Sequence, residues 1–388
     1  MKNDTNTNDS SASAETASTA PLVAASIIMA GRIQALTASG GGADSGNAYE
    51  RAIDGSGAAA CATSRNDAPS VDDRTPAARS ARVADAAADF ATIRVSYGPQ
   101  NLLVGSLDEA RLTAVGIRER RIATGKRIPM PVMRTIAELG VGKTWAAEKL
   151  VERCAPTDPD DTRRPVLLIE LNTSGKQISL PRGILKELGK RGWNIGTDAE
   201  LLWVRAIDAM REFGVEIVVF DEINRAARRP SIGPVIGGDI MDLLVVGDVA
   251  VAFLGTKEAN TVFNRCPPLK DRMKAPVVMK PLDWLVDEDR ETFIDFLDKM
   301  DAALREKGLT DVPSGLADEA IAKPLWDVCR GRLRPLCLLL EEAVTAIHRD
   351  GGAGTKVISA DVLAQAVEDH SIPAEIVDYN PFTEEKPA

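Results

Sequence analysis

Two short segments of the sequence carry residue types that could bind and hydrolyse a nucleoside triphosphate. Residues 137–144 read Ala-Glu-Leu-Gly-Val-Gly-Lys-Thr, and residues 217–222 read Ile-Val-Val-Phe-Asp-Glu. The first has the pattern of a phosphate-binding loop, in which backbone N–H groups cradle phosphate, a lysine neutralises its charge and a hydroxyl reaches Mg²⁺. The second is an apolar strand that ends in two carboxylates. Together they predict an Mg-ATP-dependent P-loop ATPase.

Each polar residue of these segments has an expected role. Lys143 would neutralise the β- and γ-phosphates, and Thr144 would ligate Mg²⁺. Asp221 would hold Mg²⁺ through water, and Glu222 would orient or deprotonate the attacking water. Ala137 replaces the first glycine of the usual pattern, but the two glycines that must curl around phosphate are present. The residues expected to contact the nucleotide are Gly140, Val141, Gly142, Lys143, Thr144 and Trp145.

Composition limits the other classes of function. The chain has 388 residues, of which 44% are hydrophobic, and its net charge is −10, so its overall field repels nucleic acid. Its five cysteines form no C-x-x-C pair and it has only two histidines, so neither a zinc site nor a disulfide framework is predicted. The apolar run at 20–30 is too short to span a bilayer. We therefore expect a soluble, cytoplasmic protein with reduced thiols.

The pattern along the chain predicts an α/β core with further segments at both ends. Residues 1–90 are rich in small and polar residues and are expected to be a disordered extension. In residues 91–281, apolar strands near 131–136, 165–171, 215–221 and 249–254 alternate with helices, which favours a parallel sheet flanked by helices. One of these helices would begin at the capping-box pattern Ser106–Glu109. Residues 282–370 would form a small C-terminal helical lid, and 371–388 a flexible tail.

Five clusters in this order make residues 105–382 resemble AAA+ ATPases, and within them the DNA-transposition regulators of the TniB/TnsC kind. Two are the segments above. The others are a strand that ends at Phe253–Ala259, the segment Leu269–Met273 and the sequence Gly331–Arg334. The closing Asn380-Pro381-Phe382 is also similar to the tails of such proteins. Met273 departs from the family pattern, which usually has phenylalanine there.

The resemblance implies three further roles at the nucleotide. Thr256 would position the attacking water or sense the γ-phosphate, Arg272 would be an arginine finger that reaches a neighbouring subunit, and Arg334 would be the sensor-2 arginine. Each has a simpler alternative. The threonine could only cap a turn, and Arg272 could pair with Asp271 on the surface. Arg334 could be a solvated charge.

The resemblance also implies partners and a sequence of events. The protein would form a homo-oligomeric ring or filament on non-specific double-stranded DNA with ATP, recruit a transposase and a target-selection protein, and disassemble on hydrolysis. Basic residues that could bind the phosphate backbone lie at 118–127, in the loop 172–182 and after the acidic strand. Each group could equally be a solvated face. The residues we expect to contact DNA are Lys176, Arg182, Arg228 and Arg229.

Other functions would use the same motifs. A replication-type helicase loader or initiator shares all of them. A small-molecule phosphotransferase would need the phosphate loop but neither Arg272 nor a lid arginine, and a nucleotide-dependent scaffold would not need Glu222. Stimulation of ATP hydrolysis by DNA separates the first two functions from the last two, and co-purification with a transposase or a helicase separates the first two from each other.

Overall fold

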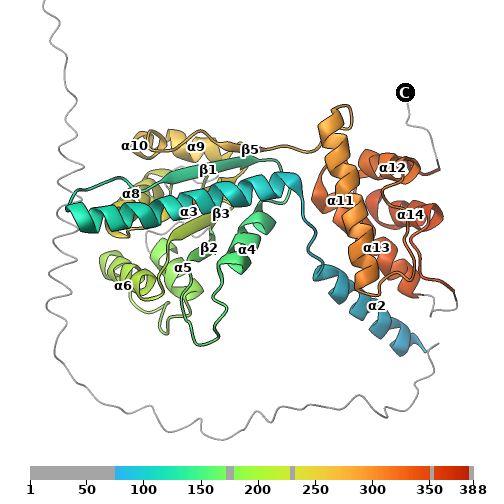
Figure 1. Ribbon diagram of the computed structural model, residues 1–388, viewed down its shortest axis with the longest axis horizontal. Coiled ribbons are helices and arrows are strands. Elements are labelled where there is room, and N and C mark those ends of the chain that lie inside the picture. The colour runs from blue at the N-terminus through green and yellow to red at the C-terminus, as the bar shows by residue number, and fades with distance from the viewer. Residues whose placement is uncertain (1–74, 172–178, 228–231, 350–353, 384–388) are drawn as a thin grey trace, which may run out of the picture. The chain divides into compact units, whose positions relative to one another are not determined.

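The computed structural model describes residues 75–171, 179–227, 232–349 and 354–383 (Figure 1). Its core is a five-stranded, fully parallel sheet in the order β2-β3-β4-β1-β5. Helices flank this sheet, and more helices follow it, so the predicted α/β class, a parallel sheet flanked by helices with a helical C-terminal part, is confirmed. The strands are β1 (Val132–Ala137), β2 (Val166–Glu170), β3 (Ile217–Asp221), β4 (Ala250–Gly255) and β5 (Val277–Met279).

The central strands are apolar because both faces of the sheet are covered. Every residue of β3 and β4 is buried, as is typical of a parallel sheet between two layers of helices. Phe220 on β3 and Phe253 on β4 are paired in register, and their rings stack with centroids 5.7 Å apart. Because all strands are parallel, the segments that follow β1, β3 and β4 emerge at one edge of the sheet, which we call the carboxyl edge.

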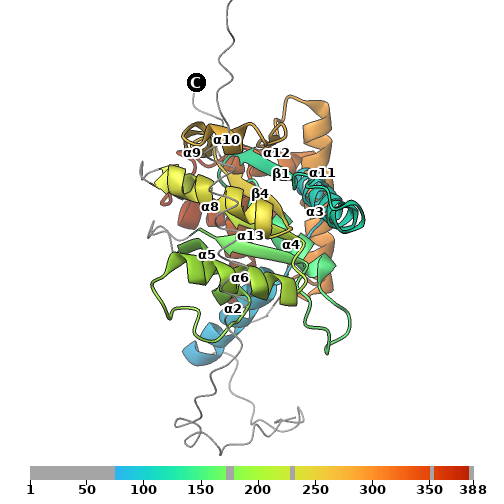
Figure 2. The same ribbon diagram turned by 90° about the vertical axis from the view of Figure 1, so that its left-hand side faces the viewer.

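Helices α3 (Gly98–Thr124) and α4 (Lys143–Cys154) lie on one face of the sheet and α8 (Ile232–Val246) on the other (Figure 2). The predicted start of the first helix at Ser106 was wrong. The helix begins two turns earlier, where Pro99 fits the first turn, and Ser106 lies inside it and donates to the Leu102 carbonyl. The apolar face, which includes Leu103 and Leu107, continues through the expected capping position.

The remaining core helices connect the strands. They are α5 (Ser179–Glu187), α6 (Ala199–Glu212), α7 (Asn224–Ala227), α9 (Ala259–Asn264) and α10 (Pro267–Lys270). The cap of α6 is Asp198, whose carboxylate accepts hydrogen bonds from the backbone N–H groups of Glu200 and Leu201.

The helical C-terminal part also contains a helix from the N-terminal side of the core. Its helices are α11 (Asp287–Glu306), α12 (Glu319–Cys329), α13 (Leu333–Arg349) and α14 (Ala360–Ala366), followed by a π-helical turn at Val367–Ser371. Helix α2 (Pro76–Ala91) and the segment that follows it up to Tyr97 pack in the same hydrophobic cluster as these C-terminal helices. The predicted extension to residue 90 is therefore too long, since the alanine-rich α2 buries Ala86 and Phe90. Residues 1–74 lie outside the described residues.

Candidate nucleotide site

The loop between β1 and α4 has the backbone that a phosphate cradle requires. Gly140 and Gly142 have φ angles of 79° and 91°, in the left-handed region that favours glycine. A Cβ at Gly142 would lie 2.2 Å from Gln100 Nε2, so any larger residue there would displace the Gln100 side chain. Val141 between them is buried and anchors the loop. Helix α4 begins at Lys143, directly after the loop.

The predicted cation, hydroxyl and two carboxylates meet at the carboxyl edge. Lys143 is only 5% exposed, and its Nζ lies 3.9 Å from Glu222 Oε1. The Thr144 hydroxyl donates to Asp221 Oδ2 over 2.6 Å. Asp221 is the last residue of β3 and is itself buried. Residues 77 positions apart in the chain are therefore in direct contact, as the sequence pattern requires.

This group of side chains fits a hydrated Mg²⁺ ion. Mg²⁺ takes oxygen ligands, keeps several waters and is usually held by one or two protein side chains together with substrate phosphates. The Thr144 hydroxyl and the Asp221 carboxylate supply two such oxygens beside the loop. Lys143 balances the charge of Glu222 in the same place.

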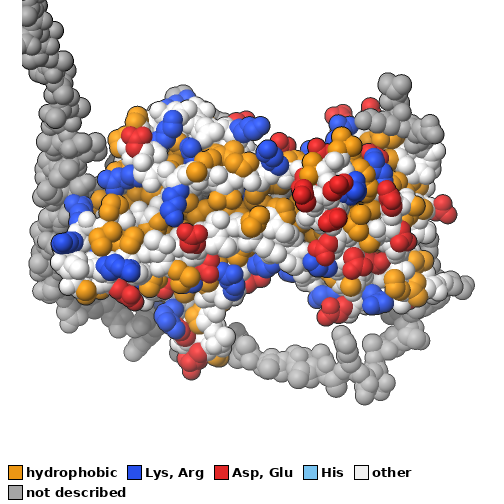
Figure 3. Space-filling model, turned by 45° about the horizontal axis from the view of Figure 1, so that its top comes forward, with side chains coloured by type: hydrophobic (Ala, Val, Ile, Leu, Met, Phe, Trp, Pro, Cys, Tyr) orange, Lys and Arg blue, Asp and Glu red, His pale blue; other side chains and the backbone are white. Residues whose placement is uncertain are grey.

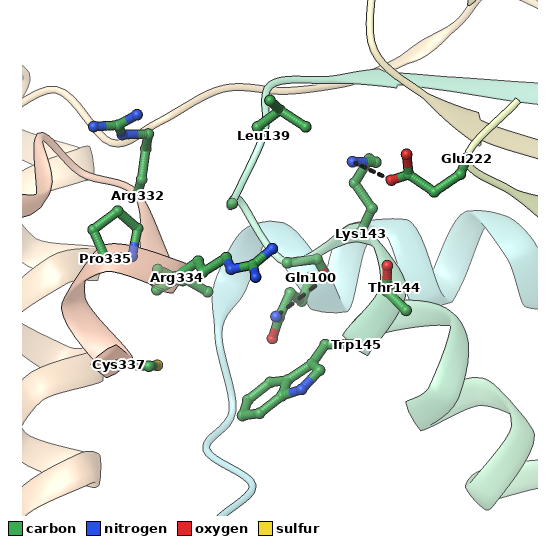
Figure 4. Close-up of a pocket in the computed structure, with 13 residues that line it drawn as sticks. Gln100, Leu139, Lys143, Thr144, Trp145, Glu222, Arg332, Arg334, Pro335 and Cys337 are labelled. Carbon is green, nitrogen blue, oxygen red and sulfur yellow. Dashed lines mark hydrogen bonds and ion pairs between the residues drawn. The ribbon is translucent and has the colours of Figure 1, made fainter. Parts of the chain in front are cut away.

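A cavity of about 510 Å³ opens between the loop and the first turn of α13 (Figure 4). The backbone N–H of Arg334 donates to the Gly140 carbonyl over 3.0 Å, so α13 contacts the loop directly. Figure 4 shows the Arg334 guanidinium directed toward the loop and that of Arg332 directed away from it. Arg334 therefore has the geometry expected of a lid arginine. The other residues that line the cavity include Gln100, Leu139, Trp145, Pro335 and Cys337.

Two polar residues of this region were missed by sequence reasoning. Gln100 on α3 is buried and donates to the Gly142 carbonyl over 3.4 Å. Asn224 follows the acidic pair and hydrogen-bonds both to Glu222 and to the backbone of Thr256. No local pattern marks Gln100, whereas Asn224 could have been noticed from its place two residues after the catalytic candidate.

Burial also changes the acidity of groups near the cavity. The pKa of the Cys337 thiol, which lines the cavity, is raised to about 11 by burial, and that of the fully buried Cys329 to about 12. These thiols therefore stay protonated at neutral pH and are poor nucleophiles. The described cysteines Cys154, Cys266, Cys329 and Cys337 form no disulfide with one another.

The predicted arginine finger lies apart from this cavity. Arg272 follows the short helix α10, is exposed and does not line the cavity. Thr256, directly after β4, has a buried hydroxyl without a hydrogen-bond partner in the part of the chain that is described. Thr256 is thus connected to the acidic pair by the hydrogen bonds of Asn224. Arg272 is exposed and can contact another molecule.

The structure describes few of the residues expected to contact DNA. Lys176, Arg228 and Arg229 lie outside the described residues. Arg182 donates to the Gly196 carbonyl over 2.6 Å. In the stretch 118–127, Arg118 and Arg121 bind groups of the protein itself. On the face shown in Figure 3, Lys and Arg side chains are scattered over the core and do not form one patch.

The sequence of the core matches a protein family. The family model described as bacterial TniB protein matches residues 118–281. The match covers less than half of the chain. It ends at Pro281, where the predicted core also ends, and it contains the phosphate loop and the acidic pair. The predicted resemblance is confirmed over these residues.

Several solved structures are similar at low sequence identity. The ORC2 protein of Aeropyrum pernix, in ADPNP and ADP complexes, has 16% identity and a TM-score of 0.48 over 68% of this chain and 67% of that one. Cdc6p from Pyrobaculum aerophilum has 17% identity and a TM-score of 0.48 over 73% and 70%. Drosophila ORC bound to DNA has 14% identity and a TM-score of 0.44 over 80% and 71%.

Two further searches gave negative results. Among curated protein sequences, none matches this chain. No helix in the described residues combines the length and the apolar character needed to cross a bilayer.

Proposed function

We propose that this chain binds and hydrolyses ATP with Mg²⁺ at the carboxyl edge of its sheet. The observation that carries the proposal is the meeting of Lys143, Thr144, Asp221 and Glu222 around the cavity of about 510 Å³. Ligands of open α/β sheets bind at this edge. The lid supports the same site because Arg334 contacts the loop.

In this proposal each side chain of the site has one role. Lys143 binds the β- and γ-phosphates, and Arg334 binds the γ-phosphate from the lid. Thr144 and Asp221 hold Mg²⁺, which neutralises charge on the phosphate oxygens when it is bound. Glu222 accepts a proton from the attacking water or orients it, and Thr256 contributes a hydroxyl nearby. Glu222 faces the cavity, as this role requires.

The match to the TniB family over residues 118–281 supports a proposal for the biological role. We propose that the protein regulates DNA transposition by assembling on double-stranded DNA with ATP, recruiting a transposase, and leaving the DNA after hydrolysis. Arg272 supports assembly, because an exposed arginine outside its own cavity can complete the site of a neighbouring copy. The DNA contacts proposed for Lys176, Arg182, Arg228 and Arg229 belong to the same hypothesis.

The test is hydrolysis of ATP by the purified chain with and without duplex DNA. We expect DNA to stimulate turnover, and we expect the Glu222→Gln variant to bind ATP but to lose about 10²–10⁴-fold in kcat, as for loss of a general base. Electron microscopy of this variant with ATP and DNA should show rings or filaments. Turnover that is indifferent to DNA, with a monomeric variant, would instead indicate a phosphotransferase or a switch.

A further inference from the structure

The side chain of Asn224 connects the two strand ends that border the nucleotide site. Asn224 is the first residue of α7 and is only 6% exposed. Its amide nitrogen donates to Glu222 Oε2 over 3.2 Å, and its amide oxygen accepts from the backbone N–H of Thr256 over 3.4 Å. One amide group thus bridges the residue after β3 and the residue after β4.

The backbone around Glu222 is held in one conformation. Glu222 has a φ of 56°, a left-handed value that non-glycine residues seldom adopt and that costs about 1–3 kcal/mol. Its backbone N–H donates to Asp221 Oδ1 over 2.7 Å, and the next N–H, of Ile223, donates to the Leu254 carbonyl of β4 over 3.1 Å. The turn therefore aims the Glu222 side chain, and β4 supports the turn.

Two cations compete for the Glu222 carboxylate. Lys143 Nζ lies 3.9 Å from Oε1, on the side of the cavity. Arg225 Nε lies 3.9 Å from Oε2, and the same guanidinium forms an ion pair of 2.5 Å with Glu170 at the end of β2. Without a further partner, Oε2 could move into hydrogen-bond distance of Arg225 and turn the carboxylate away from the cavity.

We propose that Asn224 is a positioning residue that keeps the Glu222 carboxylate at the cavity and against the attraction of Arg225. Its hydrogen bond occupies Oε2, so Oε1 stays directed toward Lys143 and the place of the attacking water. Because the same amide accepts from Thr256, a shift at the end of β4 changes the position of Glu222. This inference rests on the ATPase function proposed above.

The experiment compares steady-state ATP hydrolysis by the full chain and by Asn224→Ala. We expect kcat to fall by about 10- to 100-fold, the scale of a misplaced catalytic group. KM and the stoichiometry of ATP binding should stay within about twofold, because Asn224 does not touch the loop that binds phosphate. Asn224→Asp gives a second variant of nearly the same shape. It keeps an acceptor for Thr256 but repels Glu222, so kcat should fall at least as much.

A second-site variant separates positioning from loss of structure. If Arg225 draws the carboxylate away, then Arg225→Ala combined with Asn224→Ala should recover part of the lost kcat, by about fivefold or more. A general structural defect would not be repaired by a second truncation. Asn260→Ala is the matched control, since that amide accepts from Arg134 on another part of the core and should leave kcat unchanged.

The outcomes separate this inference from the function on which it rests. Normal kcat in both Asn224 variants, or no recovery in the double variant, would overturn the positioning role while Glu222→Gln stays inactive. Full activity of Glu222→Gln would instead overturn the proposed role of the glutamate and, with it, the role of Asn224. A loss of ATP-binding stoichiometry that matches the loss of kcat would assign Asn224 to folding.

Discussion

The two edges of the same sheet both gather charged side chains, but they use them differently. At the carboxyl edge, Lys143 and Glu222 face a cavity and are 3.9 Å apart. At the opposite edge, where the strands begin and which we call the amino edge, Arg118 donates to two backbone carbonyls. These are the carbonyls of Val215 and Asp248, just before β3 and β4. At the carboxyl edge, the polar groups face a cavity that a ligand can enter. At the amino edge, they bind α3 to the segments that precede the strands.

Two other arginines of α3, Arg111 and Arg121, also contact groups just before these strands. Arg111 forms an ion pair with Glu216 just before β3, and Arg121 forms one with Asp248 and donates to the Ile128 carbonyl. A basic stretch in the sequence can therefore be a set of structural contacts. What separates a binding cation from a structural one is whether the protein already supplies its partner.

The largest expected effect tests whether the carboxyl edge is complete within one chain. Arg272→Ala should lower DNA-stimulated kcat on the order of 10³-fold, the scale of a lost arginine finger. Mixing it with Glu222→Gln, which is inactive for another reason, should restore part of the activity, because each supplies what the other lacks at a shared site. Arg305→Ala, at the exposed end of α11, is the control. An absence of complementation would place Arg272 outside the site.

The next effect concerns the cation that faces the cavity. Lys143→Ala should weaken ATP binding on the order of 10²-fold, since hydrogen bonds to charged phosphate oxygens are lost. Titration with a fluorescent ATP analogue measures this. Lys149→Ala on the same helix should bind normally, because that ammonium group donates to Asn101 away from the loop. Equal losses in both variants would contradict the assignment of Lys143.

At the amino edge the expected loss is of stability. Arg118→Ala should lower the free energy of unfolding by about 1–3 kcal/mol, because the part-buried carbonyls of Val215 and Asp248 lose their donor. The affinity for ATP should not change. Arg127→Ala, an exposed residue beyond the helix, should stay within about 0.5 kcal/mol of the native chain in urea unfolding. A stable Arg118→Ala variant with weakened DNA binding would instead show that Arg118 binds DNA and is not a structural residue.

The smallest effect comes from a buried ionisable group, Cys329, on which the desolvation by burial outweighs the opposing charge of Arg332. Burial raises the pKa of Cys329 to about 12, so the folded chain keeps this proton at a pH where the unfolded chain has released it. Stability contributed by the neutral thiol is complete below about pH 8.5 and falls above it, by up to about 1.4 kcal/mol per pH unit. Urea unfolding at pH 8 and pH 10 should show a smaller decrease in Cys329→Ala than in the native chain. Equal slopes would contradict this cause.

The sequence predicted much of the local structure around the proposed nucleotide site, because the signals for that structure are local. Glycines at two positions permit the loop conformation, and Lys143 and Thr144 follow at the start of a helix. The apolar run before Asp221 had to be a buried strand, and parallel strands bring their carboxyl ends together. Helix limits were less certain. Pro99 and a continuous apolar face extended α3 past the capping pattern at Ser106.

The sequence by itself therefore determined the phosphate loop, the acidic strand and the α/β class, since each depends on neighbours within a few residues. Only the tertiary structure decided which charged groups remain available. Arg118 finds its carbonyls 97 and 130 residues away, and Asn224 reaches Thr256 across 32 residues. Such partners are set by how strands and helices pack. No spacing in the sequence encodes them.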